Sequence, residues 1–577
     1  MLYFDIEADN LAEVTTKKKG KWWVVQPEVS QVWCMVVVDM ETNDEKLYVG
    51  EEEIRNGVER LARSSCVVGH NVCFYDIPVL HRLFGLPLDT MFVDTCIVSK
   101  LMHPILEDSP ITAHSLEAWG KYLQCAKGNY SDWSKYTDEM GRYCIQDCRV
   151  GVKIYEKQLK WIQENKALCK MEHEVSRILA RQQENGFRID EDAIDALDYE
   201  LTCEICSLED HLQAVFPPIT TERWSEKTGK RLKDSVEIFN PGSTHHIASR
   251  FNSKYGWCAP ITEKGNPKVD KEVISSLTYP EAKDIARIKL LTTERNYLQD
   301  YQRRLPYTRD GKLHASTDPQ RAVTGRMGSS QPNLQNVNRE GRVRSLFIPR
   351  DGWSLVGVDA SGLEARMLAH FLYPFDNGAY ARLVLTGDIH ANTMKVVGIK
   401  DRNVAKTFMY AVHYGAKERK ITMVLGVSWD EAGKAIKKYK RGIVGLEELI
   451  NNLEVEHRSY MRTHSTRCGR IKLIDGRLVG SRKLSSVLNT LCQGCGAVIM
   501  KRAQIILDDI LTKEFGIERW AWCATVHDEF QIECEPAIAE EVSLAGQRAI
   551  KEAGEFYATN IPLAAEGSVG ENWGETH

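Results

Sequence analysis

The chain has 577 residues, of which 43% are hydrophobic and 27% charged, and its formal net charge is −5 at pH 7. At roughly 150 residues per domain, this length excludes a single domain and predicts about four. The negative charge argues against a simple basic nucleic-acid binder, although an enzyme can combine acidic sites with a basic channel. No run of about 18 or more apolar residues occurs, so no membrane-spanning helix is expected.

The 16 cysteines occur without a secretory leader or other targeting signal, which indicates a reducing compartment. Two Cys-x-x-Cys pairs are present, Cys203/Cys206 and Cys492/Cys495. Zinc sites usually bring two such pairs together at short spacing. Because these pairs lie nearly 290 residues apart, we expect no shared zinc site, and we expect the second pair to be buried in a helix.

Residues 1–165 are expected to form a mixed α/β domain. Residues 1–8 and 32–40 have the pattern of buried strands. Helical periodicity follows over 115–123 and 140–161.

Residues 166–310 are expected to be mostly helical. Helical periodicity covers 171–184, 192–215 and 280–301. A stretch rich in proline and glycine, 216–245, predicts turns between the second and third of these helices.

The remaining residues mix strands and helices. Residues 353–358 predict a short buried strand, and 363–371 continue as a helix. Further on, Asp401 is placed to cap a helix that runs to about Tyr414. Residues 521–534 predict a hairpin.

A first set of carboxylates lies in the N-terminal domain. Asp5 and Glu7 are two apart on a strand and face the same side, where they repel each other unless a cation lies between them. Alone, such a pair is more typical of an exposed strand. Asp76 follows a further apolar run, and Tyr143 and Asp147 share one face of a helix. Four acids can hold two divalent ions, one generating a hydroxide and one stabilising the leaving oxygen.

This ordered set resembles the DEDD 3′–5′ exonucleases of the tyrosine subtype, with all three of their motifs. The resemblance implies a ribonuclease H-like domain in which Asp5, Glu7, Asp76 and Asp147 bind two Mg²⁺ ions, for which Mn²⁺ can substitute. It also implies that Tyr143 orients the attacking water. An inactive, degenerate domain is the alternative, although no expected acid is missing. A cleaved leader is not expected, because its removal would take Asp5 and Glu7 with it.

A second pair of acids lies in the C-terminal half. Asp359 follows a buried strand and precedes three small residues, 360–362, which let a large ligand approach the backbone. His527 and Asp528 occupy the tip of the predicted hairpin. Either acid alone is more typical of an ordinary loop.

The helix predicted between these acids carries an unusual face. Arg402, Lys406, Tyr410 and Tyr414 spread over about 120° of its surface. Two cations followed by two aromatic rings suit a triphosphate beside a sugar and a base. An amphipathic helix with a solvated basic end fits the spacing equally well.

The segment with Asp359, the helix from Arg402 to Tyr414 and the hairpin with Asp528 come in this order along the chain. Together they resemble the three polymerase motifs of family A DNA polymerases, and the resemblance covers nearly the whole chain. It is closest to the phage replicative branch, which begins directly with the exonuclease. It implies a multidomain α+β and α/β architecture with a right-hand polymerase of thumb, palm and fingers. The implied domains are the exonuclease at 1–165, the thumb and start of the polymerase at 166–310, the first part of the palm at 311–385, the fingers at 386–470 and the second part of the palm at 471–577.

The resemblance implies roles for residues around the nucleotide. Asp359, Asp528 and the backbone of Ala360 would bind two Mg²⁺ ions, which activate the primer 3′-hydroxyl and neutralise the triphosphate. Six residues would surround the nucleotide: Arg402, Lys406, His390, Tyr410, Glu364 and Tyr414. The three basic ones would bind the triphosphate, and Lys406 would protonate the pyrophosphate. Glu364 would exclude a ribose 2′-hydroxyl, and the two tyrosines would contact the deoxyribose and the template position.

A further set is implied to contact DNA or the nearby nucleotide: Arg326, Asn333, Gln335, Arg344, Asn489, Gln493 and His527. Donors in the minor groove can test pair shape without reading sequence, because every correct pair presents acceptors there. Taken singly, each of these residues is more typical of a polar surface. The last residue, His577, is expected to pack near the polymerase site.

The sequence therefore predicts a template-directed DNA polymerase with a proofreading 3′–5′ exonuclease, working as a monomer on primer–template DNA and dNTPs. A phage enzyme in the cytoplasm of a bacterial host is expected, with prophage and organelle replicases as alternative origins. A helicase, primase or processivity factor is not assigned. The short, mildly basic stretch at 216–245 predicts modest processivity.

Three rival functions would each use part of this pattern. A nuclease whose C-terminal part only binds nucleic acid would not need Asp359, Lys406 and Asp528, yet all are present. A single-subunit RNA polymerase is disfavoured by Glu364 and by the exonuclease motifs. A non-enzymatic DNA-binding protein has no use for two complete sets of acids.

Overall fold

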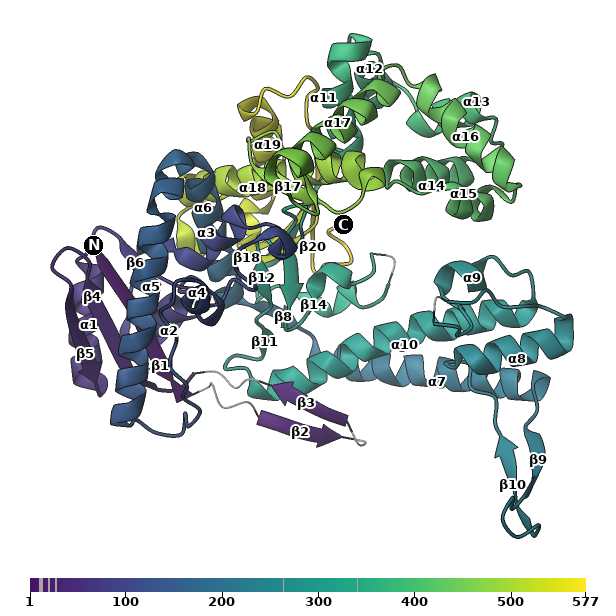
Figure 1. Ribbon diagram of the computed structural model, residues 1–577, viewed down its shortest axis with the longest axis horizontal. Helices are drawn as coiled ribbons and strands as arrows, with labels where there is room; N and C mark the ends of the chain where they lie inside the picture. The colour runs from purple at the N-terminus through teal and green to yellow at the C-terminus, as the bar shows by residue number, and fades with distance from the viewer. Residues whose placement is uncertain (10–13, 19–20, 26–28, 263, 340) are drawn as a thin grey trace. The chain divides into compact units, whose positions relative to one another are not determined.

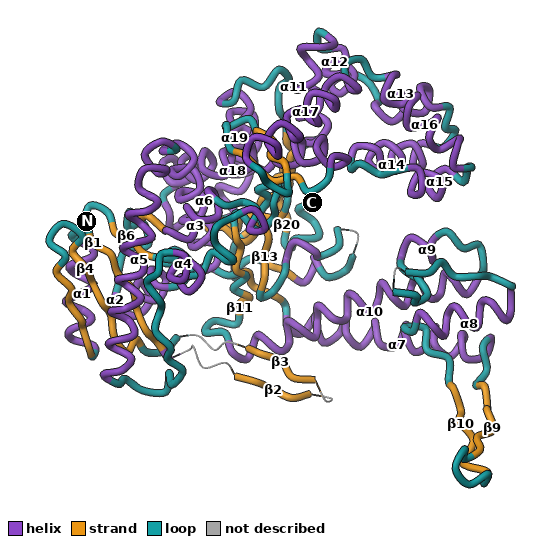
Figure 2. The backbone as a smooth tube through the Cα atoms, viewed as in Figure 1, coloured by secondary structure: helices purple, strands orange, loops and turns teal. Residues whose placement is uncertain are grey.

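The computed structural model (Figures 1 and 2) describes residues 1–9, 14–18, 21–25, 29–262, 264–339 and 341–577. The chain forms two compact units. The first comprises Met1–Ile189, Arg304–Arg339 and Phe347–His577, and the second comprises Asp190–Arg303 and Glu340–Leu346. Among the described residues, no helix is long and apolar enough to cross a bilayer.

The N-terminal part of the first unit contains a five-stranded mixed sheet with the strand order β5-β4-β1-β6-β7. Its strands are β1 (Leu2–Ala8), β4 (Val32–Asp39), β5 (Asp44–Val49), β6 (Val67–Gly69) and β7 (Phe92–Asp94). β1 runs antiparallel to β4 and parallel to β6. The two long strands predicted in this part are confirmed. A separate two-stranded sheet pairs β2 (Val14–Lys18) with β3 (Lys21–Val25).

The alternation of β1 determines which side chains face which helix. Leu2, Phe4 and Ile6 pack in a core with α1 (Glu51–Ala62) and α2 (Asp76–Phe84). Tyr3 packs on the opposite side against α5 (Asp138–Glu164). Because alternate residues of a strand share a face, Asp5 and Glu7 lie on the side of α5. Three further helices complete this part: α3 (Thr95–Met102), α4 (Leu116–Tyr122) and α6 (Lys166–Asn185).

The C-terminal part of the first unit is built on a four-stranded antiparallel sheet with the order β18-β19-β15-β20. The strands are β15 (Ser354–Ala360), β18 (Trp520–Val526), β19 (Glu529–Cys534) and β20 (Ala565–Gly570). The predicted hairpin and the strand predicted at 353–358 are confirmed, but β15 extends to Ala360 and so contains Asp359 instead of ending before it. The large core of this part includes residues of the sheet and of α6, α11 (Leu363–Asp376), α18 (Val487–Phe515) and α19 (Ala539–Phe556).

A run of helices connects α11 with α18. They are α12 (Ala379–Thr386), α13 (Ile389–Val397), α14 (Arg402–His413), α15 (Glu418–Leu425), α16 (Trp429–Gly442) and α17 (Leu446–His464). The Asp401 carboxylate accepts a hydrogen bond from the Val404 N–H at 2.8 Å, so the predicted cap of α14 is confirmed. This bond marks the first turn of α14, the helix that carries the predicted face.

Short strands complete the first unit. They form the sheet β11 (Lys312–Leu313), β8 (Phe187–Ile189) and β14 (Phe347–Ile348), the pair β12 (Ser316–Asp318) and β13 (Gly328–Ser330), and the pair β16 (Gly469–Lys472) and β17 (Leu478–Ser481).

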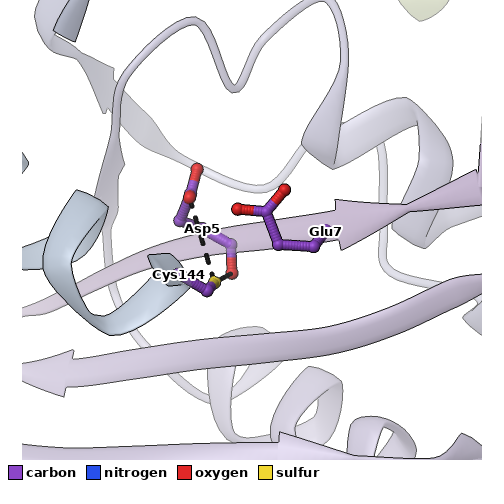
Figure 3. A group of neighbouring side chains, drawn as sticks. All are labelled: Asp5, Glu7 and Cys144. Carbon is purple, nitrogen blue, oxygen red and sulfur yellow. Dashed lines mark hydrogen bonds between the residues drawn. The ribbon is translucent and has the colours of Figure 1, made fainter. Parts of the chain in front are cut away.

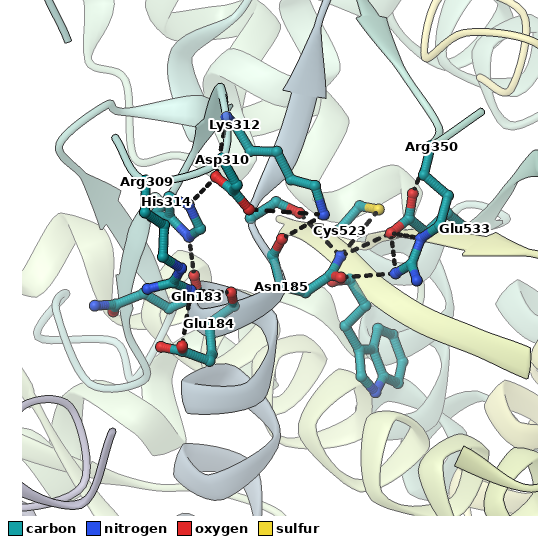
Figure 4. Close-up of polar contacts among 12 residues, drawn as sticks. Gln183, Glu184, Asn185, Arg309, Asp310, Lys312, His314, Arg350, Cys523 and Glu533 are labelled. Atoms are coloured by element: carbon teal, nitrogen blue, oxygen red, sulfur yellow. Dashed lines mark hydrogen bonds and ion pairs between the residues drawn. The ribbon is translucent and has the colours of Figure 1, made fainter. Parts of the chain in front are cut away.

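An ion pair between the partly exposed Arg350 and the buried Glu533 anchors one end of the β18–β19 hairpin (Figure 4). The Arg350 backbone N–H donates to Glu533 Oε2 at 2.8 Å, and its guanidinium Nε donates to Oε1 at 2.9 Å. Asn185, at the end of α6, donates its amide N–H to the same Oε1 at 3.0 Å. Glu533 lies opposite Leu355, at the end of β19 far from the turn. This anchoring holds the hairpin against α6 at the end far from the turn.

The second unit is mostly helical. It contains α7 (Glu191–Val215), α8 (Thr244–Tyr255), α9 (Lys271–Ser275) and most of α10 (Pro280–Arg304) around a core of its own. The stretch at 216–245, which was predicted to be rich in turns, also contains an antiparallel hairpin of β9 (Ile219–Trp224) and β10 (Arg231–Glu237) that the sequence did not predict. β-branched residues in both strands and Gly229, whose φ is 63°, favour this hairpin.

Candidate active sites

The first group of acids is the N-terminal acidic cluster, defined as Asp5, Glu7, Asp76 and Asp147. The structure brings these four predicted residues together from β1, α2 and α5. The pairing of β1 with β6 covers only the first two residues of β1, so the Ile6 N–H lies beyond it. That N–H donates to Asp76 Oδ1 at 3.2 Å, which fixes this carboxylate beside the strand.

Crowding and burial disfavour negative charge in this cluster. Burial, followed by the charges of Asp76 and Glu7, raises the pKa of Asp5 well above its ordinary value. Burial raises the pKa of Asp76 to about 8, and burial and then Asp147 raise that of Glu7. A divalent cation among these oxygens would restore the ionised state, and oxygen-rich sets of this kind suit Mg²⁺ or Mn²⁺.

Cys144 also borders the cluster (Figure 3). Ligand atoms of Asp5, Glu7 and Cys144 all lie within 4.8 Å of one another. The Cys144 sulfur is 3.9 Å from Asp5 Oδ2 and 3.6 Å from the Asp5 carbonyl oxygen. Sequence reasoning missed this residue, although its place directly after Tyr143 could have marked it as part of the same helix.

Lys127 is the second residue that sequence reasoning missed. Its Nζ lies 2.9 Å from Asp147 Oδ2 and 5.0 Å from the centroid of the Tyr143 ring. Lys127 and Tyr143 line a groove of about 990 Å³ together with His70 and Asn71. Lys127 belongs to a loop without periodicity, so no local pattern could connect it to the acids.

The second pair of acids meets at one end of the four-stranded sheet. Asp359 lies opposite Glu529 in the register of β15 and β19. Asp528 lies in the turn before β19, and its carbonyl oxygen accepts a hydrogen bond from the Ala360 N–H at 3.0 Å. Burial and then the neighbouring Asp528 raise the pKa of Asp359 to about 6, and burial raises that of Asp528. His527 has a φ of 55°, a left-handed conformation that recurs at functional turns.

The last residues of the chain pack on the same sheet. The Trp573 indole N–H donates to Glu529 Oε1, and His577 Nδ1 lies 2.7 Å from Glu529 Oε2. A Cβ atom at Gly357 would lie 1.9 Å from the Thr576 carbonyl oxygen, so glycine permits this close approach. The prediction that His577 packs near the second pair of acids is confirmed.

Glu364 is held between two other predicted residues. Arg326 donates from Nη2 to Glu364 Oε1 at 2.7 Å, and the Tyr414 hydroxyl donates to Oε2 at 3.0 Å. Arg326 and Glu364 also line a small cavity of about 20 Å³ with His527 and Asp528. Residues from four separate segments therefore converge beside the second pair of acids.

The polar face of α14 agrees with its predicted pattern. Arg402 and Lys406 are exposed and Tyr410 is half-buried. Arg402 Nε lies 2.9 Å from Asp388 Oδ2, and the same carboxylate caps α13 by accepting from the His390 N–H. The His390 and Tyr410 rings lie 6.3 Å apart. Arg402, His390 and Tyr410 therefore lie along one region of the helical run.

The first three turns of α18 have one narrow stripe that is not buried. Between residues 487 and 498, only Asn489, Gln493 and Ala497 are not buried. They are spaced four apart and so lie on one face. Ala497 also lines the small cavity beside Asp528, so the stripe leads from the two predicted amides toward the acids.

Gln335 is already bonded to the hairpin. Its amide N–H donates to the Thr525 carbonyl at 2.9 Å, and its Oε1 accepts from the His527 N–H at 3.3 Å. Asn333 Oδ1 accepts from the Gln335 backbone N–H at 3.1 Å. Gln335 therefore supports the turn that carries Asp528.

Two arginines near residue 340 belong to different units. Arg339, which sequence reasoning missed, has Nη1 3.8 Å from Asp359 Oδ2 in the first unit. Arg344, which was predicted to contact the nucleotide, is buried in the second unit.

Comparison with known proteins identifies the relatives of this chain. Residues 220–575 match the family model described as DNA polymerase family A. The chain is 30% identical to the DNA-directed DNA polymerases of Enterobacteria phage T3 and Escherichia phage T7, over 100% of this chain and of each relative. It is 28% identical to the thermostable DNA polymerase I of Thermus thermophilus, over 73% of this chain and 50% of that protein.

A solved structure shares the fold. It is the POL domain of Pol1 from M. smegmatis in complex with DNA primer-template and dNTP. The TM-score is 0.77 at 18% identity, and the match covers 100% of this chain and 96% of that one.

Proposed function

The chain belongs to DNA polymerase family A and is a DNA-directed DNA polymerase, and we propose that it also removes nucleotides from the primer 3′ end at a second site. The observation that carries this proposal is the assembly of two separate groups of carboxylates in the first unit. One group lies on the five-stranded sheet and the other on the four-stranded sheet. The proposal assigns extension to the second pair and proofreading digestion to the N-terminal acidic cluster.

We assign the carboxylates of Asp359 and Asp528, with the backbone at Ala360, to two Mg²⁺ ions, for which Mn²⁺ can substitute. The raised pKa values of the two acids and their place together at one end of the sheet support this assignment. When bound, such ions lower the pKa of the attacking hydroxyl or water and neutralise the leaving oxygen.

The side chains of α14 are proposed to bind the incoming dNTP. The exposed cations Arg402 and Lys406, together with His390, attract the triphosphate. Lys406 donates a proton to the departing pyrophosphate. Tyr410 contacts the deoxyribose, and Tyr414 stacks at the template position.

The primer–template duplex is proposed to lie along the polar groups around the hairpin. Asn489 and Gln493 on the stripe of α18 offer amide donors to the minor groove, as does Arg326. Asn333 and Gln335 support the turn from which His527 reaches the primer end. Arg344 is buried in the second unit, and its implied role near the nucleotide stays a prediction.

The N-terminal acidic cluster is proposed to bind two divalent ions in the same way. Carboxylates whose pKa values are raised by burial and then by one another support this assignment. Tyr143, on the helix of Asp147, is proposed to orient the attacking water.

The domains are proposed to follow the family's order, with the exonuclease at 1–165, the thumb at 166–310, the palm at 311–385 and 471–577, and the fingers at 386–470. Closure of the fingers would enclose the nucleotide. The enzyme is proposed to copy a phage genome in a bacterial host, as a monomer of modest processivity. Product lengths measured with a trap for released polymerase, with and without host extract, test that last point.

Changing Tyr410 to phenylalanine is expected to increase discrimination against dideoxynucleotides by about fivefold or more, because a lost hydrogen bond of about 1 kcal/mol or more changes selectivity on that scale. The tyrosine hydroxyl can replace the 3′-hydroxyl that a chain terminator lacks. Single-nucleotide incorporation of dNTP and ddNTP measures the ratio. Equal discrimination by Tyr410→Phe and wild type would refute the assigned sugar contact.

Changing Glu364 to alanine is expected to relax discrimination against ribonucleotides by about tenfold to a hundredfold, because a truncated side chain opens the space of the 2′-hydroxyl. Glu364→Gln is the matched control, since it keeps the volume and removes the charge. It should retain selection against rNTPs. If both variants lose selection equally, charge rather than volume excludes the ribose.

A labelled primer–template tests the proposed pair of activities directly. With Mg²⁺ and dNTPs the primer should lengthen, and with Mg²⁺ alone it should shorten from its 3′ end. With rNTPs little extension is expected. Efficient extension with rNTPs favours an RNA polymerase, and the absence of any shortening removes the proposed exonuclease.

A further inference from the structure

Lys127 has a fixed place beside the N-terminal acidic cluster. The Gln146 side chain donates to the Ala126 carbonyl at 2.8 Å, which anchors one side of the loop. On the other side, a Cβ atom at Gly128 would lie 3.0 Å from the Tyr143 ring, so the backbone passes close to that ring. The neighbours of Lys127 are therefore held before any ligand arrives.

The ion pair with Lys127 gives the two oxygens of the Asp147 carboxylate different surroundings. Oδ2 lies 2.9 Å from Lys127 Nζ, in a side chain that is only 3% exposed. Oδ1 is buried and has no hydrogen-bond partner among the described residues. A buried carboxylate oxygen without a partner is costly, and such an atom requires an explanation. Asp147 lies close enough to Glu7 for its charge, after burial, to raise the pKa of that carboxyl, so the oxygen without a partner belongs to a carboxylate of the acidic cluster.

Lys127 also lines a groove beside the acidic cluster. It lines the groove of about 990 Å³ with Tyr143, His70, Asn71 and His114. A DNA strand carries a charge at every phosphate and is repelled by four clustered acids. A lysine on the groove wall, 27% exposed, supplies the opposite charge at that point.

We infer that Lys127 is a positioning residue of the proposed exonuclease, which holds the Asp147 carboxylate with Oδ1 directed to a divalent ion and attracts a phosphate of the entering strand. The inference rests on the proposed exonuclease activity. The proposed role requires a cation that reaches both the Asp147 carboxylate and the groove. Lys127 reaches both from a loop that α5 anchors.

The test compares Lys127→Met, which keeps length and loses charge, with Lys127→Arg. Binding of Mn²⁺ is followed by electron paramagnetic resonance, with Asp5→Ala/Glu7→Ala as the reference that lacks the cluster. Binding of a fluorescent single-stranded oligonucleotide is followed by anisotropy in EDTA. Digestion and extension rates are measured on the same preparations.

For Lys127→Met we expect digestion to fall about 10- to 100-fold and Mn²⁺ binding at the cluster to weaken by about tenfold, as for other residues that orient metal ligands. Oligonucleotide binding should weaken and depend less on salt. Lys127→Arg should recover most of each loss. Extension should stay at the wild-type rate in both variants, which shows that they are folded.

Three results overturn the inference: wild-type digestion by Lys127→Met, lost digestion with unchanged binding of Mn²⁺ and oligonucleotide, or no recovery in Lys127→Arg. Failure of the wild-type enzyme to digest DNA is a separate outcome. It removes the proposed exonuclease itself.

Discussion

Replacing Asp359 with alanine is expected to abolish primer extension, with a loss of about a thousandfold or more, because a preorganised charge at the reacting centre is removed. Digestion of the same primer should continue at the wild-type rate, since the N-terminal acidic cluster lies on a different sheet. A 5′-labelled primer–template with Mg²⁺, with and without dNTPs, measures both activities.

A matched control for this change is Asp351→Ala. Asp351 precedes the same strand but its side chain is 92% exposed, and it pairs with Arg188 at the surface. Exposed ion pairs contribute little, so extension should be unchanged. Extension that survives in Asp359→Ala would contradict the assignment of the second pair of acids.

The double change Asp5→Ala/Glu7→Ala is expected to abolish digestion, again by about a thousandfold or more, while extension persists. Two of the four oxygen-bearing side chains of the N-terminal acidic cluster would be missing. Release of labelled dNMP from single-stranded DNA measures the loss. Because these acids repel one another without a cation, the variant should unfold in EDTA at a temperature no lower than wild type.

Glu45→Ala serves as the control on the same sheet. Glu45 is exposed on β5 and pairs with Arg149 through Nη2 at 2.7 Å. Its loss should leave digestion unchanged. Digestion at the wild-type rate in the double variant would show that another group carries out the cleavage.

Local patterns were sufficient for the elements that carry these sites. The alternation of β1, the cap at Asp401 and the hairpin around Asp528 each follow from a few neighbouring residues, and each is confirmed. Which acids meet was harder to predict. The pairing of Asp359 with Glu529 depends on the register of strands that lie far apart in the chain. Family resemblance, rather than spacing, connected Asp359 with Asp528.

The residues that were missed have no local signal. Lys127 and Arg339 reach their carboxylates from loops, where periodicity does not indicate a direction. The bonds that hold Glu364 between Arg326 and Tyr414 join segments far apart in sequence. Such contacts are properties of the folded chain. The hairpin at 219–237 was missed for another reason, because abundant turn residues concealed two short strands.

The central claim is that two sites act in opposite directions on one primer end. It is tested most directly by the conversion of a single labelled dNTP to dNMP on a primer–template that stops after one addition. The wild-type enzyme should produce dNMP continuously, while Asp359→Ala produces none from free dNTP. Asp5→Ala/Glu7→Ala should add one nucleotide and stop, and mixing the two variants should restore turnover. Continuous conversion by either variant alone would contradict the account.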